Sequence, residues 1–345
     1  MIKNLLNTSI EELEKHIHTA GYPKFRAKQI FDWIYKKNIL DFNLMSNLPQ
    51  NLKCFLSDNF STIKPQIIDV KLSNSDNSYK FLLKTNDANL IESIAIIKED
   101  RVTLCVSCMI GCPLGCKFCA TGTELKFKRN LEVSEILGQF IDVQAFLNQN
   151  KISPKINNIV FMGMGEPFLN IENIEKSINR FTSKDGFGIS KNKITISTAG
   201  ITKGLSEFIN KYNIKLAVSI HFPTDEQRSE FMPINKKTPL NELITELKNI
   251  KLKKRDYITI EYLMINKIND TILHAQKLKN LIKSLKVKVN LIPYNPTKMF
   301  KAESSKEYQI NEFAKYLNSK SIFTTVRRSK GKEFLGGCGQ FVLNK

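Results

Sequence analysis

The sequence lacks any long hydrophobic run and is poor in negative charge. No segment approaches the roughly 18 consecutive apolar residues that a membrane-spanning helix needs, and the N-terminal stretch MIKNLLNTSIEELEKHI has no signal-peptide core. Asp and Glu number 33 against 52 Lys and Arg, which gives a net charge of +19. A biased genome explains part of this excess, yet it would raise the acidic residues as well. We therefore expect a cytoplasmic protein with no membrane partner and with a polyanionic partner, nucleic acid above all.

Cysteine is nearly absent outside one stretch. Five of the seven cysteines fall in CVSCMIGCPLGCKFC, residues 105–119, and the other two are Cys54 and Cys338. Structural disulfides are rare in the reducing cytoplasm, so this grouping favours metal or redox chemistry. Cys54, in NLKCFL, is expected to be a small residue of the core.

Composition and periodicity divide the chain into four parts. Residues 1–70 are expected to form a small helical accessory domain, and residues 71–100 a polar linker followed by a β-hairpin. Residues 101–300 alternate six short apolar strands with amphipathic helices, which predicts an α/β fold with a parallel sheet curved into a partial (β/α)6 barrel. Residues 301–345 add a helix, a strand and a glycine-rich arm.

Basic residues lie among the apolar positions of the N-terminal helices. They are Lys24, Arg26, Lys28, Lys36 and Lys37. Two interpretations stay open, a solvated basic face and a surface that contacts RNA.

Polar and glycine residues follow the predicted barrel strands. In parallel barrels the active site lies at the carboxyl ends of the strands, so these residues are expected to meet on one face. They are residues 163–166, 197–198, 219–221 and 294–295, together with the cysteine-rich stretch after the first strand.

The spacing C-x3-C-x2-C of Cys112, Cys116 and Cys119 favours an iron–sulfur site. Three thiolates can hold three irons of a [4Fe–4S] cluster and leave the fourth iron open for a ligand. A zinc site would pair Cys105 and Cys108 with Cys116 and Cys119, but only seven residues separate the pairs, against roughly 15–20 in a zinc ribbon. A disulfide-reductase motif is a further alternative, although Cys116 and Cys119 lie in a glycine-flanked loop.

These motifs resemble a known family. C-x3-C-x2-C, with Phe118 before the last cysteine, resembles the radical S-adenosylmethionine (SAM) superfamily. The ordered set TLCVS, GCKFCATG, FMGMGEP, ISTAG, SIH, MPIN, LIPYNP and CGQ resembles the RlmN/Cfr family of RNA adenosine methyltransferases, and FRAKQIFDWIYKK is similar to that family's N-terminal domain. The resemblance runs through nearly the whole chain.

The resemblance implies one [4Fe–4S] cluster on Cys112, Cys116 and Cys119, and two SAM molecules per turnover. It assigns SAM binding to Gly165, Glu166, Ser197, Ser219, Ile220, His221 and Asn295. The glycines of GMGE would let backbone carbonyls approach the SAM ammonium, and Glu166 would add opposite charge. A dinucleotide-binding fingerprint is disfavoured because Phe168 replaces its third glycine.

The implied chemistry solves a mismatch between two electron-poor partners. The methyl group of SAM is an electrophile, and carbon 2 of adenine lies between two ring nitrogens. In the family's implied route, Cys338 takes a methyl group from one SAM, and a radical from a second SAM removes hydrogen from that S-methyl group. The carbon radical adds to the base, Glu92 accepts a proton, and Cys105 forms a transient disulfide with Cys338. Gly336, Gly337 and Gly339 would suit a mobile arm.

Two further points concern the surroundings of the site. Cys108 stands where family members usually carry serine, and a neutral substitution is favoured over a spare thiol. Basic residues that flank the proposed chemistry are candidates for phosphate contact, with the target base leaving its stack. They are Lys126, Lys128, Arg129, Arg327, Arg328, Lys330 and Lys332.

The leading hypothesis is an enzyme that methylates carbon 2 of adenosine in 23S rRNA and in tRNA. A Cfr-type enzyme acting on carbon 8 and altering antibiotic binding is the nearest alternative; the proline of GMGEP and the N-terminal stretch favour the first branch. A non-catalytic iron–sulfur protein that binds RNA is a second alternative. By analogy we expect a flavodoxin-type electron donor and a monomer.

Overall fold

The computed structural model describes residues 2–152, 155–330, 337 and 339–341. The predicted methyl carrier Cys338, together with Gly336 and Lys332, lies outside the described residues. Within these ranges no helix is long and apolar enough to cross a membrane.

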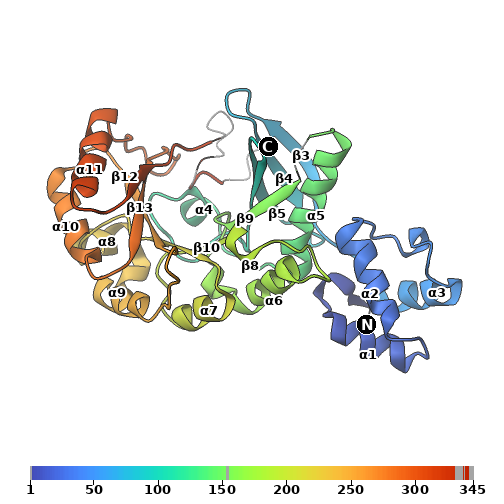
Figure 1. Cartoon of the computed structure of the whole chain (residues 1–345). Helices are drawn as coiled ribbons and strands as arrows, with labels where there is room; N and C mark the ends of the chain where they lie inside the picture. The colour runs from blue at the N-terminus through green and yellow to red at the C-terminus, as the bar shows by residue number, and fades with distance from the viewer. Residues whose placement is uncertain (1, 153–154, 331–336, 338, 342–345) are drawn as a thin grey trace.

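The N-terminal helices form a group of their own at one end of the molecule (Figure 1). Its main elements are β1 (Lys3–Asn4), α1 (Ile10–Thr19), α2 (Phe25–Phe31), α3 (Gln50–Asn59) and β2 (Phe60–Ser61), with short helical turns at Leu5–Asn7, Asp32–Lys36 and Phe42–Leu44. Helix α1 begins at Ser9, whose side chain accepts the Glu12 N–H while the Glu12 carboxylate accepts the Ser9 N–H.

Helix α3 corrects the expectation for Cys54. Leu52 and Leu56 are fully buried, whereas Cys54 is exposed. Residues two positions apart on a helix face different directions, so Cys54 falls outside the apolar stripe. Its assignment to the core was wrong.

One ten-stranded sheet forms the body of the protein, in the order β14-β13-β12-β11-β10-β9-β6-β5-β4-β3. The strands are β3 (Gln66–Leu72), β4 (Ser78–Lys84), β5 (Leu90–Lys98), β6 (Arg101–Cys105), β9 (Ile156–Phe161), β10 (Ile194–Thr198), β11 (Lys215–Ser219), β12 (Ile258–Met264), β13 (Val287–Pro293) and β14 (Thr324–Val326). Strands β6 and β9–β14 run parallel, and β3–β6 are antiparallel. The six predicted barrel strands and the fold class are confirmed.

Helices cover the outer side of the curved sheet (Figure 1). The longer ones are α5 (Val133–Gln149), α6 (Ile171–Thr182), α7 (Leu205–Tyr212), α9 (Leu240–Lys248), α10 (Ile272–Ile282) and α11 (Glu307–Ser319). Shorter elements complete the chain: β7 (Met109–Ile110), α4 (Ala120–Thr123), β8 (Arg129–Asn130) and α8 (Asp225–Phe231). Because both faces of the parallel sheet are covered, a strand such as β12 is buried along its whole length.

The segment before the hairpin differs from the prediction. Residues 66–70 were included in the predicted helical domain, but they belong to strand β3, which runs from Gln66 to Leu72 and pairs antiparallel with β4. Strand β3 is the edge of the sheet and carries polar residues on its exposed side, so its alternation is weak in the sequence. The hairpin β4–β5 therefore continues the barrel sheet through β6. The domain limits at residues 70, 100 and 300 remain a proposal.

Candidate active site

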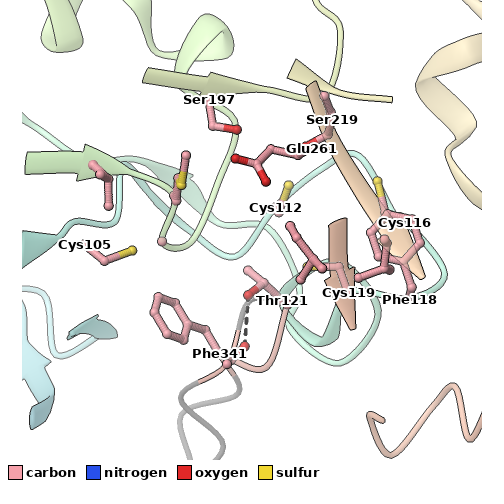
Figure 2. A pocket seen from close by; sticks show the side chains of 18 of the residues that line it. Cys105, Cys112, Cys116, Phe118, Cys119, Thr121, Ser197, Ser219, Glu261 and Phe341 are labelled. Carbon is pink, nitrogen blue, oxygen red and sulfur yellow. Dashed lines mark hydrogen bonds between the residues drawn. The ribbon is translucent and has the colours of Figure 1, made fainter. Parts of the chain in front are cut away.

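The carboxyl ends of six parallel strands open into one pocket (Figure 2). Residues from the cysteine loop, from the ends of β9–β13 and from the C-terminal residues all contribute to its lining. The predicted site residues that line it are Cys105, Cys112, Cys116, Cys119, Gly165, Glu166, Ser197, Ser219 and His221. The expected meeting of these residues on one face of the sheet is thus observed.

Three thiols share one side of this pocket. Burial raises the pKa of Cys112 to about 12, and the neighbouring Cys119 adds to the effect. Burial and the charges of Cys119 and Cys112 raise the pKa of Cys116 well above its usual value. It is costly to ionise these thiols together within the pocket. They become thiolates when a cationic group binds them and offsets that cost.

The three thiols come from one loop and line the same pocket, as the ligands of a shared cluster must. Three thiolates can bind three irons of a [4Fe–4S] cluster and leave the fourth iron open for a ligand. Cys112, Cys116 and Cys119 are the residues that would hold the cluster.

Cys105 and Cys108 differ in their access to the pocket. Cys105 ends β6, pairs with Ile94 of β5 and lines the pocket, on the side where Phe341 lies (Figure 2). Cys108 does not line it; its buried thiol donates to the Met164 carbonyl, with Sγ 3.6 Å from that oxygen. Burial, followed by the charge of Glu166, raises the pKa of Cys108 well above its usual value. This position supports the interpretation of Cys108 as a neutral substitution.

The residues on either side of Cys338 are anchored at the pocket. The Ala120 N–H donates to the Gly339 carbonyl at 2.8 Å, and Thr121 Oγ1 donates to the Phe341 carbonyl at 2.9 Å (Figure 2). Both donors belong to α4, which directly follows Cys119. Gly339 and Phe341 are therefore held beside the cysteine loop.

The glycines of this segment have specific structural tasks. A Cβ atom on Gly337 would lie 2.7 Å from Nδ2 of Asn295, and Gly339 has a φ of +79°. A side chain at Gly337 would clash, and one at Gly339 would be strained. Close packing accounts for the glycine at 337, and the positive φ accounts for the glycine at 339.

The GMGE loop is fixed by its own glutamate. One oxygen of Glu166 accepts the Ala199 N–H at 2.7 Å, and the other accepts the Phe168 N–H at 3.1 Å. Burial raises the pKa of Glu166 to about 7. A Cβ on Gly165 would lie 2.6 Å from the Met109 side chain, and the φ of Gly165 is +104°, so packing and backbone conformation both favour glycine here.

Two predicted SAM residues lie off the pocket lining. The Ile220 side chain is fully buried in the hydrophobic core, so only its backbone can face a ligand. Asn295 donates from Nδ2 to Ser329 Oγ at 2.7 Å and packs against Gly337. Asn295 thus holds the C-terminal segment in place.

His221 is a neutral residue in a strained position. Its φ is +57°, and its Nδ1 accepts the Leu263 N–H at 3.1 Å. Burial, with the nearby Arg228 charge, lowers the pKa of His221 to about 3. The neutral ring therefore carries its proton on Nε2, which is the donor that it can offer to a ligand.

Arg228 organises the strand ends and was missed in the sequence. It is fully buried and donates to the carbonyls of Ala199 at 2.5 Å, Ser219 at 3.2 Å and Ile220 at 3.3 Å, and to Asn235 Oδ1 at 2.8 Å. One guanidinium thus ties the ends of β10 and β11 to the MPIN segment. The only signal in the sequence was an arginine between the SIH and MPIN motifs.

Glu92 forms a buried ion pair. Its Oε1 lies 2.7 Å from Nζ of Lys80 on the neighbouring strand, and both side chains are almost inaccessible to solvent. Glu92 does not line the pocket, but Ile94, two residues further along β5, does. Lys80 Nζ is 6.0 Å from the Phe341 ring.

Arg129 serves the fold, which corrects its place among the RNA candidates. Its guanidinium donates to Glu135 at 2.7 and 2.8 Å and to Asp87 at 2.9 Å. Because the guanidinium N–H groups already donate to two carboxylates, few of them are free to bind a phosphate. Lys126 and Lys330, by contrast, are exposed.

Comparisons with known proteins agree with this geometry. Residues 3–61 match the ribosomal RNA large subunit methyltransferase N-terminal domain, and residues 106–278 match the radical SAM superfamily. The dual-specificity RNA methyltransferase RlmN of Lawsonia intracellularis is 42% identical over 98% of this chain and 96% of its own length. The chain belongs to the RlmN family. Like other radical SAM enzymes, it uses a [4Fe–4S] cluster and SAM.

Further relatives support the RlmN assignment. The dual-specificity RNA methyltransferase RlmN of Buchnera aphidicola is 40% identical over 98% of this chain and 93% of its own length. The crystal structure of a radical SAM methyltransferase from Sphaerobacter thermophilus superposes with a TM-score of 0.92 at 33% identity, covering 98% of this chain and 99% of that one. The fold and the enzyme class predicted from the sequence are confirmed.

Replacing Arg228 by lysine tests its role at the strand ends. Lysine keeps the charge but cannot reach four acceptors, so buried carbonyls lose their partners. We expect the free energy of unfolding to fall by about 2–4 kcal/mol and SAM binding to weaken. Urea unfolding and calorimetric titration measure the two effects, with the exposed Arg255→Lys as control. Wild-type stability in Arg228→Lys would contradict this role.

Acidification tests the burial of His221. Its pKa is lower in the folded state, so the unfolded chain takes up the proton first as the pH falls below about 6.5. Between pH 7 and pH 5 this residue should cost about 2 kcal/mol of stability. Urea unfolding of the wild type and of His221→Asn at both pH values should show a smaller loss in the variant. An equal loss in the two proteins would be inconsistent with a buried neutral His221.

Proposed function

We propose that this chain methylates carbon 2 of adenosine in 23S ribosomal RNA and in transfer RNA. The observation that carries the proposal is the shared pocket: Cys105, the three cluster cysteines and the residues on both sides of Cys338 all line it. A non-catalytic iron–sulfur protein would have no use for Cys105 and the Cys338 segment there. The family relation supports the RlmN branch over a Cfr-type enzyme.

The chain's own residues divide the work. Cys112, Cys116 and Cys119 hold the cluster, and the strand-end residues with the GMGE loop bind SAM; the bound cofactors supply a carbon-centred radical. Cys338 carries the methyl group and forms a transient disulfide with Cys105 when the product leaves.

Glu92 is proposed as the proton acceptor. It lies on β5, the strand that pairs Ile94 with Cys105 of β6, and is thus close in the sheet to the disulfide partner. Lys80 balances its charge in the interior. A carboxylate held by a neighbouring cation keeps one orientation and is shielded from bulk water.

The partners follow from charge and chemistry. We propose that RNA phosphates are contacted by the helical domain of residues 3–61 and by three exposed lysines: Lys330, which lines the pocket, and Lys126 and Lys128, which follow the cysteine loop in the sequence. Each turnover needs electrons from outside, and a flavodoxin-type donor is proposed by analogy. We place the enzyme in the cytoplasm as a monomer.

Removal of Cys105 tests the two-cysteine route. In Cys105→Ala no thiolate can attack the Cys338 sulfur, so the protein should stay covalently bound to its RNA. We expect a protein–RNA adduct that survives denaturing electrophoresis, and mass spectrometry should find a methyl group on Cys338 of the wild type incubated with SAM.

Cys54→Ser is the matched control, because Cys54 is exposed on α3 and far from the pocket in sequence. It should release methylated RNA as the wild type does and give no adduct. Free methylated RNA from Cys105→Ala at the wild-type rate, or an unmodified Cys338 in protein with an intact cluster, would rule out the route.

A further inference from the structure

Strand β12 carries one carboxylate in the interior of the barrel. Glu261 is 4% exposed and lies in the strand ITIEYLM, whose remaining six residues are all buried as well. It is in register with Ser219 of β11 and Asn290 of β13. Residues in register on parallel strands point to the same side, so these three polar side chains form one layer facing the pocket.

Only one oxygen of Glu261 is used by the protein. Oε1 accepts from Asn290 Nδ2 at 3.1 Å and lies 3.8 Å from Nη1 of Arg327. Oε2 is buried and, among the described residues, has no hydrogen-bond partner. Figure 2 shows the carboxylate pointing into the space bounded by Ser197, Ser219 and Cys112. An unsatisfied buried carboxylate oxygen is costly, and native proteins keep few of them.

Glu166, the other carboxylate that lines the pocket, differs from Glu261 in its hydrogen-bond partners. Both oxygens of Glu166 accept backbone N–H groups, so that residue is satisfied before any ligand binds. Glu261 lines the same pocket with one acceptor open. Its neighbours Ser197 and Ser219 add hydroxyl groups that both donate and accept. The pocket wall thus offers a charged acceptor beside two hydroxyls, a set that complements a pair of adjacent hydroxyls of a ligand.

We propose that Glu261 is a ligand-binding residue of this pocket and that its Oε2 accepts hydrogen bonds from the ribose hydroxyls of SAM. The inference rests on the proposed function for the identity of the ligand. Among the groups of SAM, the amino and carboxylate ends belong at the open iron beside the cysteine loop. The ribose diol is the remaining part with two adjacent O–H donors.

Binding of nucleoside analogues to the cluster-loaded protein tests this contact. The probes are SAM, S-adenosylhomocysteine, which lacks the sulfonium charge, and 2′-deoxy-S-adenosylhomocysteine, which lacks one hydroxyl. In the wild type, loss of the hydroxyl should weaken binding about tenfold to hundredfold. Glu261→Gln should weaken the binding of SAM and of S-adenosylhomocysteine to the same extent. In this variant, removal of the 2′-hydroxyl should cause little further loss of affinity.

Two controls and one comparison on the wild type keep the outcomes separate. Glu172→Gln, on the exposed side of α6, should bind all probes as the wild type does. Iron content and the visible spectrum of the cluster should be unchanged in Glu261→Gln, which distinguishes a ligand contact from a damaged site. If that variant does not fold, equal affinity of the wild type for the 2′-deoxy and parent analogues overturns the proposal without it.

Further results would overturn either the role of Glu261 or the proposed function. If Glu261→Gln binds S-adenosylhomocysteine as tightly as the wild type does, the proposal is overturned. A loss of affinity for SAM alone also overturns it, because that result would place Glu261 at the sulfonium. If the wild type binds SAM and methylates RNA while Glu261→Gln binds normally, only this inference fails. If the wild type binds no SAM, the proposed function itself fails.

Discussion

The parallel pairing of β6 with β9–β13 is the constraint on which the rest of the structure depends. It brings the carboxyl ends of these strands to one edge, so residues from Cys105 to Arg327 share a pocket despite their separation in sequence. The guanidinium of Arg228 then binds the ends of β10 and β11 together through backbone carbonyls. Without that alignment the cysteine loop, the GMGE loop and the C-terminal segment would have no common surface.

Burial gives the pocket its chemistry. The same apolar surroundings that raise the pKa of Cys112 and Cys116 keep His221 neutral. The thiols are thus poised to become thiolates on binding a cationic group, while His221 stays a hydrogen-bond donor. Glu92 is balanced by Lys80, and Glu166 by two backbone N–H groups. Of the two glutamates that line the pocket, Glu261 is the one with an oxygen that has no hydrogen-bond partner within the described residues.

Much of this could be predicted from the sequence, because the strongest signals were local. The six apolar strands and the spacing of the three cluster cysteines depend on neighbouring residues, and they indicated the fold and the cluster. Edge strand β3 was missed because polar residues on its open side hide its alternation. Cys54 was misplaced because burial on a helix depends on its phase relative to Leu52 and Leu56.

The misjudged and missed residues of the site share one cause: the folding of the chain brings their partners to them, and no local sequence pattern marks the pairing. Arg129 looked like a phosphate contact until Asp87 and Glu135 were found at its guanidinium. Arg228 binds carbonyls that no sequence pattern marks, and the open oxygen of Glu261 appears only when the facing strands are in place. Such long-range satisfaction of polar groups is decided by the tertiary structure.

The position of the new methyl group on RNA tests the central claim most directly. RNA that the reconstituted enzyme has modified with SAM and reductant is digested to nucleosides and analysed by liquid chromatography with mass spectrometry. The account predicts 2-methyladenosine from ribosomal and transfer RNA. Formation of 8-methyladenosine, or of no methylated adenosine by an enzyme with an intact cluster, would contradict it.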